Sequence, residues 1–140
     1  MRMKLIVAAM AVVVLGLVLT ACGGGRGDDT SNLKKIDQQR TGDYIVTALN
    51  ETGQVKQGPN KFTLEFRKAS DNKLTDVGNV QINSTMPMPG MPPMNAGASA
   101  TPSGTAGRYN VESDIPMRGK WGFAVNFANG QRAQLSINVQ

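Results

Sequence analysis

Five methionine side chains are the residues of this 140-residue sequence best suited to chemistry. Four lie in a short proline-rich run and the fifth lies further along the chain: Met86, Met88, Met91, Met94 and Met117. Thioether sulfur is a soft ligand that prefers soft ions, whereas Zn²⁺ and Cu²⁺ sites generally use imidazole or thiolate. The sequence has no histidine and a single cysteine. The methionines therefore predict a thioether site for Cu(I), or for its mimic Ag(I).

Two other interpretations fit the same methionines. Methionine is flexible and fills gaps in hydrophobic cores, so the cluster can be ordinary packing. A methionine-rich surface also adapts to protein partners, which suits a non-metal structural or assembly accessory that docks a membrane protein complex. Titration with Cu(I) separates the metal site from these two alternatives.

The four prolines between Met86 and Met94 limit the backbone geometry of this run. They remove backbone donors and favour polyproline II, so we expect a loop or an edge rather than a central strand. In that helix Met88, Met91 and Met94 share one face but are about 9 Å apart along the axis. Sulfurs on one ion must lie about 4 Å apart. We therefore expect a site made of two sulfurs from this run together with Met117.

Residues for catalysis are scarce in this sequence. Histidine, the usual general base near neutral pH, is absent. The only adjacent carboxylates are Asp28 and Asp29, and neither a phosphate-binding loop nor a G-x-S-x-G motif occurs. We therefore expect no enzymatic activity.

The N-terminal residues have the organisation of a lipoprotein signal peptide. Arg2 and Lys4 precede an apolar run over residues 5–19, which is shorter than the about 20 residues of a transmembrane helix. The following segment Leu19-Thr20-Ala21-Cys22 resembles the bacterial lipobox, whose cysteine receives a diacylglyceryl group before cleavage in front of it. We predict a signal peptide over residues 1–21 and lipidation at Cys22.

The lipid anchor determines the predicted location of the protein. Cys22 is the only cysteine, so no internal disulfide competes for its thiol. Two acyl chains give stable membrane binding where one gives only marginal binding. We expect the protein in the cell envelope, outside the cytoplasm. It would lie on the periplasmic face of the outer membrane in a cell with two membranes, or on the outer face of the plasma membrane in a cell with one.

The composition of residues 22–140 indicates a flexible tether followed by one domain. Residues 22–40 are rich in glycine and polar residues, which indicates a lipidated tether. Residues 41–140 are enough for one compact domain. The formal net charge of +5 falls to +3 once Arg2 and Lys4 are removed. The basic residues form no stripe interleaved with aromatics, so we expect no nucleic-acid partner.

Short alternating segments predict an all-β domain. Bulky residues alternate with small or polar ones over residues 62–66, 121–127 and 133–139, and Asn129-Gly130 predicts a hairpin between the last two segments. Residues 95–107 are low-complexity and suggest a flexible excursion. No helical period occurs after the signal peptide. About seven strands around the single tryptophan, Trp121, favour an immunoglobulin-like antiparallel β-sandwich over a barrel.

Several short motifs together resemble the YtkA-like domain, which is related to FixH. The matching segments are Gly42-Asp43-Tyr44, Gly58-Pro59-Asn60-Lys61-Phe62, Met86-Pro87-Met88-Pro89-Gly90-Met91, Gly107-Arg108-Tyr109 and Ile115-Pro116-Met117-Arg118-Gly119-Lys120-Trp121. The resemblance covers residues 41–139. It implies an immunoglobulin-like β-sandwich exposed outside the cytoplasm.

The resemblance also implies a partner and a cargo. FixH-type proteins are associated with copper transport and cytochrome oxidase assembly, which implies a membrane protein complex for oxidase assembly or for cation or copper transport. Related metal-handling lipoproteins often carry histidine in the Met-Pro segment. This chain has no histidine. A mixed histidine and methionine copper site is therefore excluded.

Overall fold

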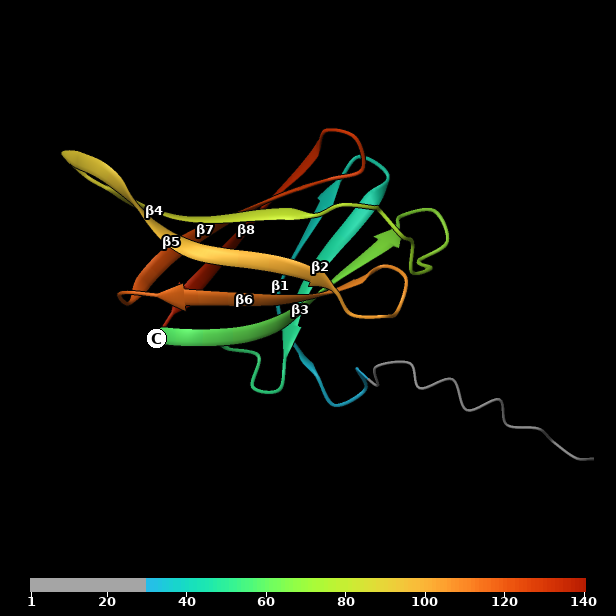
Figure 1. The fold of residues 1–140 in the computed structure, drawn as a ribbon, viewed down its shortest axis with the longest axis horizontal. Helices are drawn as coiled ribbons and strands as arrows, with labels where there is room; N and C mark the ends of the chain where they lie inside the picture. Colours follow the sequence, from blue (N-terminus) through green and yellow to red (C-terminus); the bar gives the residue numbers. More distant parts are fainter. Residues whose placement is uncertain (1–29) are drawn as a thin grey trace, which may run out of the picture.

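This computed structural model of the protein describes residues 30–140, which form eight β-strands (Figure 1). In chain order the strands are β1 (Lys34–Thr41), β2 (Tyr44–Asn50), β3 (Gly58–Lys68), β4 (Gln81–Met88), β5 (Met91–Pro102), β6 (Arg108–Ile115), β7 (Gly119–Phe127) and β8 (Gln131–Val139). The predicted signal peptide over residues 1–21 and the predicted lipidation residue Cys22 lie outside the described residues. Within residues 30–140 no helix is long and apolar enough to cross a membrane.

The strands form one antiparallel sheet in the order β1-β2-β3-β6-β5-β4-β7-β8. The sheet curls until its two edge strands meet, and the backbone N–H of Ser136 in β8 donates to the carboxylate of Asp37 in β1 at 2.8 Å. The connection before β3 also contacts the end of β8, where the N–H of Gln140 donates to the carbonyl of Val55 at 3.0 Å. The predicted all-β, sandwich-like fold is confirmed, with eight strands in a single nearly closed sheet.

The core lies between the two halves of the curled sheet. β7 contributes Trp121, Phe123, Val125 and Phe127, all of which are buried, as their alternation predicts. Phe123 meets Phe62 of β3 edge to face, with ring centroids 5.7 Å apart. The predicted hairpin is also present, because Phe127 and Gln131 pair across residues 128–130. β7 is therefore the core strand that its pattern predicts, although it lies next to the edge strand β8 in the order of the sheet.

The first strand corrects the predicted tether, which was expected to extend to residue 40. β1 consists of Lys34–Thr41 and pairs with β2 along its length, from Lys34 opposite Asn50 to Thr41 opposite Tyr44. Its composition is polar, and Ile36 is its one hydrophobic side chain packed on the core. Such a strand is stabilised by backbone pairing with its neighbour, which composition does not reveal. The folded domain therefore begins earlier than residue 41.

The fifth strand corrects two further expectations. Residues 86–94 do not form a polyproline II loop, and residues 95–102 are not part of a flexible excursion, because Met91–Pro102 is strand β5, between β4 and β6. Residues 103–107 are the connection from β5 to β6. The first half of β5, up to Ala96, pairs with β4, and its second half, from Gly97 to Pro102, pairs with β6, so Pro92 and Pro93 lie in a part of β5 that has only β4 as a paired neighbour. Half-buried alanines at 96, 98 and 100 form its inward face. Because these side chains are so small, the alternation is weak in the sequence.

Candidate functional site

The β4–β5 hairpin carries four of the five methionines and projects from one end of the domain, at the upper left of Figure 1. Its turn is Met88-Pro89-Gly90-Met91, in which Gly90 has φ 72°. Proline at the second position and a glycine with positive φ at the third are typical of a type II turn. This turn places Met88 directly opposite Met91 in the ladder. The prolines therefore help to form a hairpin instead of an extended loop.

A second pair of methionines lies further down the same hairpin, where Met86 is opposite Met94. Residues directly opposite in an antiparallel ladder project to the same face, and so do residues two apart in one strand. Pro92 and Pro93 face the single residue Pro87, which makes a β-bulge between the two pairs. The hairpin thus carries two successive methionine pairs on one face.

The inner pair, Met86 and Met94, is half-buried and packs against the hydrophobic core. The methyl group of Met86 lies over Gly119 at the start of β7. A Cβ at Gly119 would approach Cε of Met86 to 2.6 Å, and Gly119 has φ 133°. The positive φ therefore requires glycine at this position, and a larger residue would also displace the flexible end of Met86.

Met117 lies in the connection between β6 and β7, two residues before Gly119, and is also half-buried against the core. Its carbonyl oxygen accepts a hydrogen bond from the indole Nε1 of Trp121 at 3.0 Å. The preceding carbonyl of Pro116 accepts a bond from the side chain of Gln57 at 2.9 Å. Hydrogen bonds from Gln57 and Trp121 therefore fix the connection that carries Met117. Its neighbour Gly119 contacts Met86 of the inner pair.

The predicted metal ligands thus fall into two groups. The inner group is defined as Met86, Met94 and Met117, which are all half-buried and pack against the core. The outer pair is defined as Met88 and Met91 at the turn. Met91 is 63% exposed, the highest exposure of any large hydrophobic residue in the described part of the chain. Met88, Met91 and Met94 were expected on one face of a polyproline II helix. They instead belong to two methionine pairs of an antiparallel hairpin.

The charge around the hairpin suits a soft monovalent ion better than a hard cation. The sequence has no charged residue from Val77 to Gly107. Within residues 30–140 no group of three or more histidine, cysteine, aspartate or glutamate side chains could hold a metal. Neutral thioethers are the donors that the hairpin provides, and such donors select soft ions.

Sequence reasoning missed two residues that position this end of the domain, Gly119 and Trp121 in their contacts with Met86 and Met117. Trp121 was predicted as a core residue, which its complete burial confirms. Its bond to the Met117 carbonyl depends on the turn conformation and has no signal in the sequence. The pairing of Met88 with Met91 did have a signal, because Met-Pro-Gly-Met matches a type II turn.

A buried ion cluster lies away from the methionines. Glu65 in β3 is 5% exposed. Its carboxylate accepts from Arg67 at 3.0 Å and from Arg108 at 3.2 Å. The guanidinium of Arg108 also donates to the hydroxyl of Thr30 at 3.1 Å. Because both carboxylate oxygens are bonded to arginine, the cluster is structural, and it ties the first described residue to the start of β6.

The hydroxyl of Tyr109 in β6 has two partners in the connection before β4. This hydroxyl lies 2.6 Å from the carbonyl oxygen of Gly78, to which it donates, and 3.2 Å from a carboxylate oxygen of Asp76. Burial raises the pKa of this hydroxyl above its ordinary value of 10.0, and the negative charge of Asp76 raises it further. The neutral phenol therefore serves as a structural link between β6 and the connection before β4.

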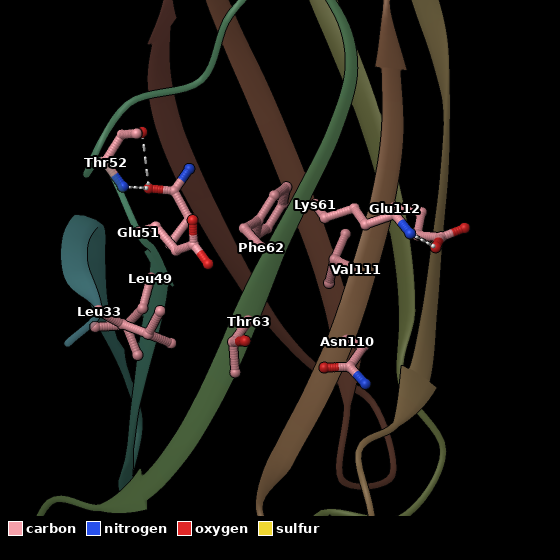
Figure 2. Close-up of a pocket in the computed structure, with 11 residues that line it drawn as sticks. Leu33, Leu49, Glu51, Thr52, Lys61, Phe62, Thr63, Asn110, Val111 and Glu112 are labelled. Carbon is pink, nitrogen blue, oxygen red and sulfur yellow. Dashed lines mark hydrogen bonds and ion pairs between the residues drawn. The ribbon is translucent and has the colours of Figure 1, made fainter. Parts of the chain in front are cut away.

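A groove of about 580 Å³ crosses the outer face of β2, β3 and β6 (Figure 2). Leu33 and Leu49 line one end of it. The other end carries an ion pair between Lys61 and Glu112 at 3.2 Å, in which both side chains are mostly exposed. Exposed pairs of this kind contribute little free energy. The groove has no set of soft donors among its lining residues, so the methionine hairpin is the stronger candidate site.

The fold and the hairpin define a small all-β domain with a methionine-lined end. Comparison with protein families matches residues 39–126 to the YtkA-like family. The match extends from β1 into β7 and includes the hairpin and Met117, so the chain belongs to the YtkA-like family. No match was found among curated proteins.

Proposed function

We propose that this protein is a lipid-anchored, extracytoplasmic binding protein, and not an enzyme, that holds one Cu(I) ion through Met86, Met94 and Met117. The observation that carries the proposal is the direct pairing of Met86 with Met94, together with the contact of Met86 with Gly119, two residues after Met117. Three neutral thioethers at one half-buried place form a donor set for a soft monovalent ion.

The spacing of the inner group is compatible with one ion. Opposite residues in an antiparallel ladder have Cβ atoms about 4.5–5.5 Å apart. Two sulfurs at about 2.3 Å from one ion lie roughly 4.0 to 4.6 Å apart. Met86 and Met94 can reach that separation by side-chain rotation, without moving the backbone. The third thioether then comes from the connection between β6 and β7.

The membrane enters the proposal through residues outside the described part of the chain. The predicted cleavage before Cys22 would leave a diacylglyceryl anchor on the first residue of the mature protein. The described domain starts at Thr30, so a short segment would separate it from the bilayer. In this setting the protein would exchange Cu(I) with a membrane complex for oxidase assembly or for cation or copper transport.

Methionine-to-leucine variants test the proposal, because leucine roughly conserves volume and should cost less than about 1.5 kcal/mol of stability. Purified protein is titrated with Cu(I) under reducing conditions against a competing chelator. Met86→Leu, Met94→Leu and Met117→Leu should each weaken Cu(I) binding by about tenfold or more. Met91→Leu makes the same chemical change at the exposed thioether, and it should weaken binding less than about threefold.

Two results would contradict the copper proposal. One is a parent protein that binds no Cu(I). The other is a set of folded variants, verified by urea unfolding, that all bind Cu(I) as the parent does. In either case the methionines serve packing or partner contacts.

A second candidate function is docking to a membrane protein complex without a metal. The exposure of Met91 on the projecting hairpin favours it. A photo-crosslinker placed at residue 91 in cells would then capture one partner reproducibly, and the leucine variants of the inner group would leave that capture unchanged. Loss of capture when copper is removed would favour the metal site instead.

A further inference from the structure

We propose that the outer pair, Met88 and Met91, is a separate loading site that receives Cu(I) from a donor and passes it to the inner group. This inference rests on the proposed function and adds a second binding position and a direction of transfer. Its basis is the division of the hairpin into two methionine pairs, one that contains the exposed Met91 and one that packs on the core.

The two pairs are placed for transfer along one face. Met86 and Met88 are two residues apart in β4, which corresponds to about 7 Å along a strand. Each has its partner directly opposite in β5. A methionine side chain has three rotatable bonds, so a thioether of one pair can reach an ion held by the other. The ion therefore needs no backbone movement to pass between the pairs.

The two pairs also differ in access. Met91 is 63% exposed, whereas Met86 contacts Gly119 and packs on the core together with Met94. A bulky donor complex can therefore approach Met91 more readily than the half-buried inner group. Prolines at 87, 89, 92 and 93 fix φ on both sides of the turn. The outer sulfurs are thus presented by a stiff backbone, and little entropy is lost when they bind an ion.

The charges near the hairpin favour a negatively charged donor. Arg118 and Lys120 follow Met117 and are exposed, and the exposed Asp114 lies before it, so these three residues carry a net positive charge, whereas the hairpin itself has no charged residue. A cationic patch beside a neutral site attracts anionic complexes and raises their rate of encounter. The donor class that fits is an anionic Cu(I) complex or an acidic copper-carrying protein.

The transfer is a ligand exchange without oxidation or proton movement. A bond between Cu(I) and Sδ of Met91 forms as a donor-ligand bond to the ion breaks, and Met88 displaces a second donor ligand. Bonds to Met86 and Met94 then replace those to the outer pair. The ion remains Cu(I) throughout, and thioethers carry no proton to release.

Uptake kinetics test the loading site. The protein is mixed with the anionic Cu(I) complex of bathocuproine disulfonate, and loss of its visible absorbance is followed. The double variant Met88→Leu/Met91→Leu should take up Cu(I) about tenfold more slowly than the parent, while its equilibrium affinity stays within about threefold. The matched double variant Met86→Leu/Met94→Leu should lose equilibrium affinity but keep the fast initial capture.

Methyl NMR with Ag(I) gives a second measurement that separates the sites. The first equivalent should shift the methyl signals of Met86, Met94 and Met117 at equilibrium, and the second should shift those of Met88 and Met91. The loading site is overturned if the outer double variant takes up Cu(I) at the parental rate, or if all five signals shift together with the first equivalent. A parent that binds neither ion overturns the copper proposal itself, and the loading site with it.

Discussion

Trp121 links the hydrophobic core to the methionine end of the domain. Its side chain is fully buried, and its indole N–H holds the carbonyl of Met117 at 3.0 Å. The residue therefore has two roles, one through its apolar surface and one through a single hydrogen bond. Substitutions at this position separate the two contributions.

Trp121→Ala should lower the free energy of unfolding by about 3–5 kcal/mol, because it leaves a large cavity in the core. Trp121→Phe keeps most of the apolar surface and removes the bond to Met117, which costs about 1 kcal/mol for the bond itself. Urea unfolding followed by circular dichroism measures both. A loss below about 1 kcal/mol for the alanine variant is incompatible with the buried position.

The raised pKa of Tyr109 predicts how the free energy of unfolding depends on pH. Its pKa is raised in the folded state by burial first and by Asp76 second. Folding then favours the protonated phenol, so this contribution is fully present below a pH of about 10 and is lost as the pH rises through the higher folded pKa. Tyr109→Phe removes the titrating group together with that loss.

The measurement is the free energy of unfolding of the parent and of Tyr109→Phe between neutral pH and about pH 11. The parent should be more stable at neutral pH, by about 1 kcal/mol for its hydrogen bond, and its advantage should shrink above pH 10. Parallel curves across the whole range would show that ionisation of Tyr109 does not affect folding. Both proteins have the same lysines, so the difference between the two curves cancels any effect of lysine ionisation on stability.

At the scale of elements, the β4–β5 hairpin shows how turn chemistry creates the candidate site. Gly90 has φ 72° and leaves open space around a Cβ position. Gly97, in the same hairpin, also has open space but no positive φ. The two glycines therefore differ in backbone conformation and not in crowding, which makes them a matched pair.

Gly90→Ala should lower the free energy of unfolding by about 1 kcal/mol or more, because alanine is strained at positive φ. Gly97→Ala should leave the free energy unchanged or raise it by up to about 1 kcal/mol. Methyl NMR should also show that the signals of Met88 and Met91 move in the Gly90 variant only. Equal effects of the two substitutions on stability would argue against the type II turn.

At the scale of the whole molecule, the nearly closed sheet separates the start of the domain from the methionines. Arg108 holds Thr30 at one end of β6, and Met117 follows the other end. An eight-residue strand is about 27 Å long. The methionine hairpin therefore projects at the end opposite to the entry of the chain (Figure 1). In the proposed anchored state it would face away from the attachment point.

The anchoring proposal is tested at Cys22. Cys22→Ser removes the only thiol that can be lipidated, so the variant should leave the membrane fraction while its domain stays folded. Membranes are washed with high salt and the protein is followed by immunoblot, with the circular dichroism spectrum of the variant as the control for folding. Retention of the variant in washed membranes would show that another segment or a partner holds it.

The sequence alone was enough to predict the strands whose pattern of side chains lies within a few consecutive residues. Large side chains alternate over residues 121–127 and 133–139, and a period of two buries one face of a strand whatever its partner is. The soft donor set could also be predicted, because residue types alone exclude histidine and leave the methionines. The short motifs likewise gave the family that the comparison confirms.

Only the tertiary structure showed that β1 and β5 are strands. β1 is mostly polar and β5 consists mainly of small residues after Met94, so their positions depend on backbone bonds to β2 and to β4 and β6. Such bonds join residues that are distant in sequence, and local composition does not encode their register. For the same reason only the folded chain separates the methionines into an inner group and an outer pair. The bulge beside the turn and the contact of Met86 with Gly119 make that division.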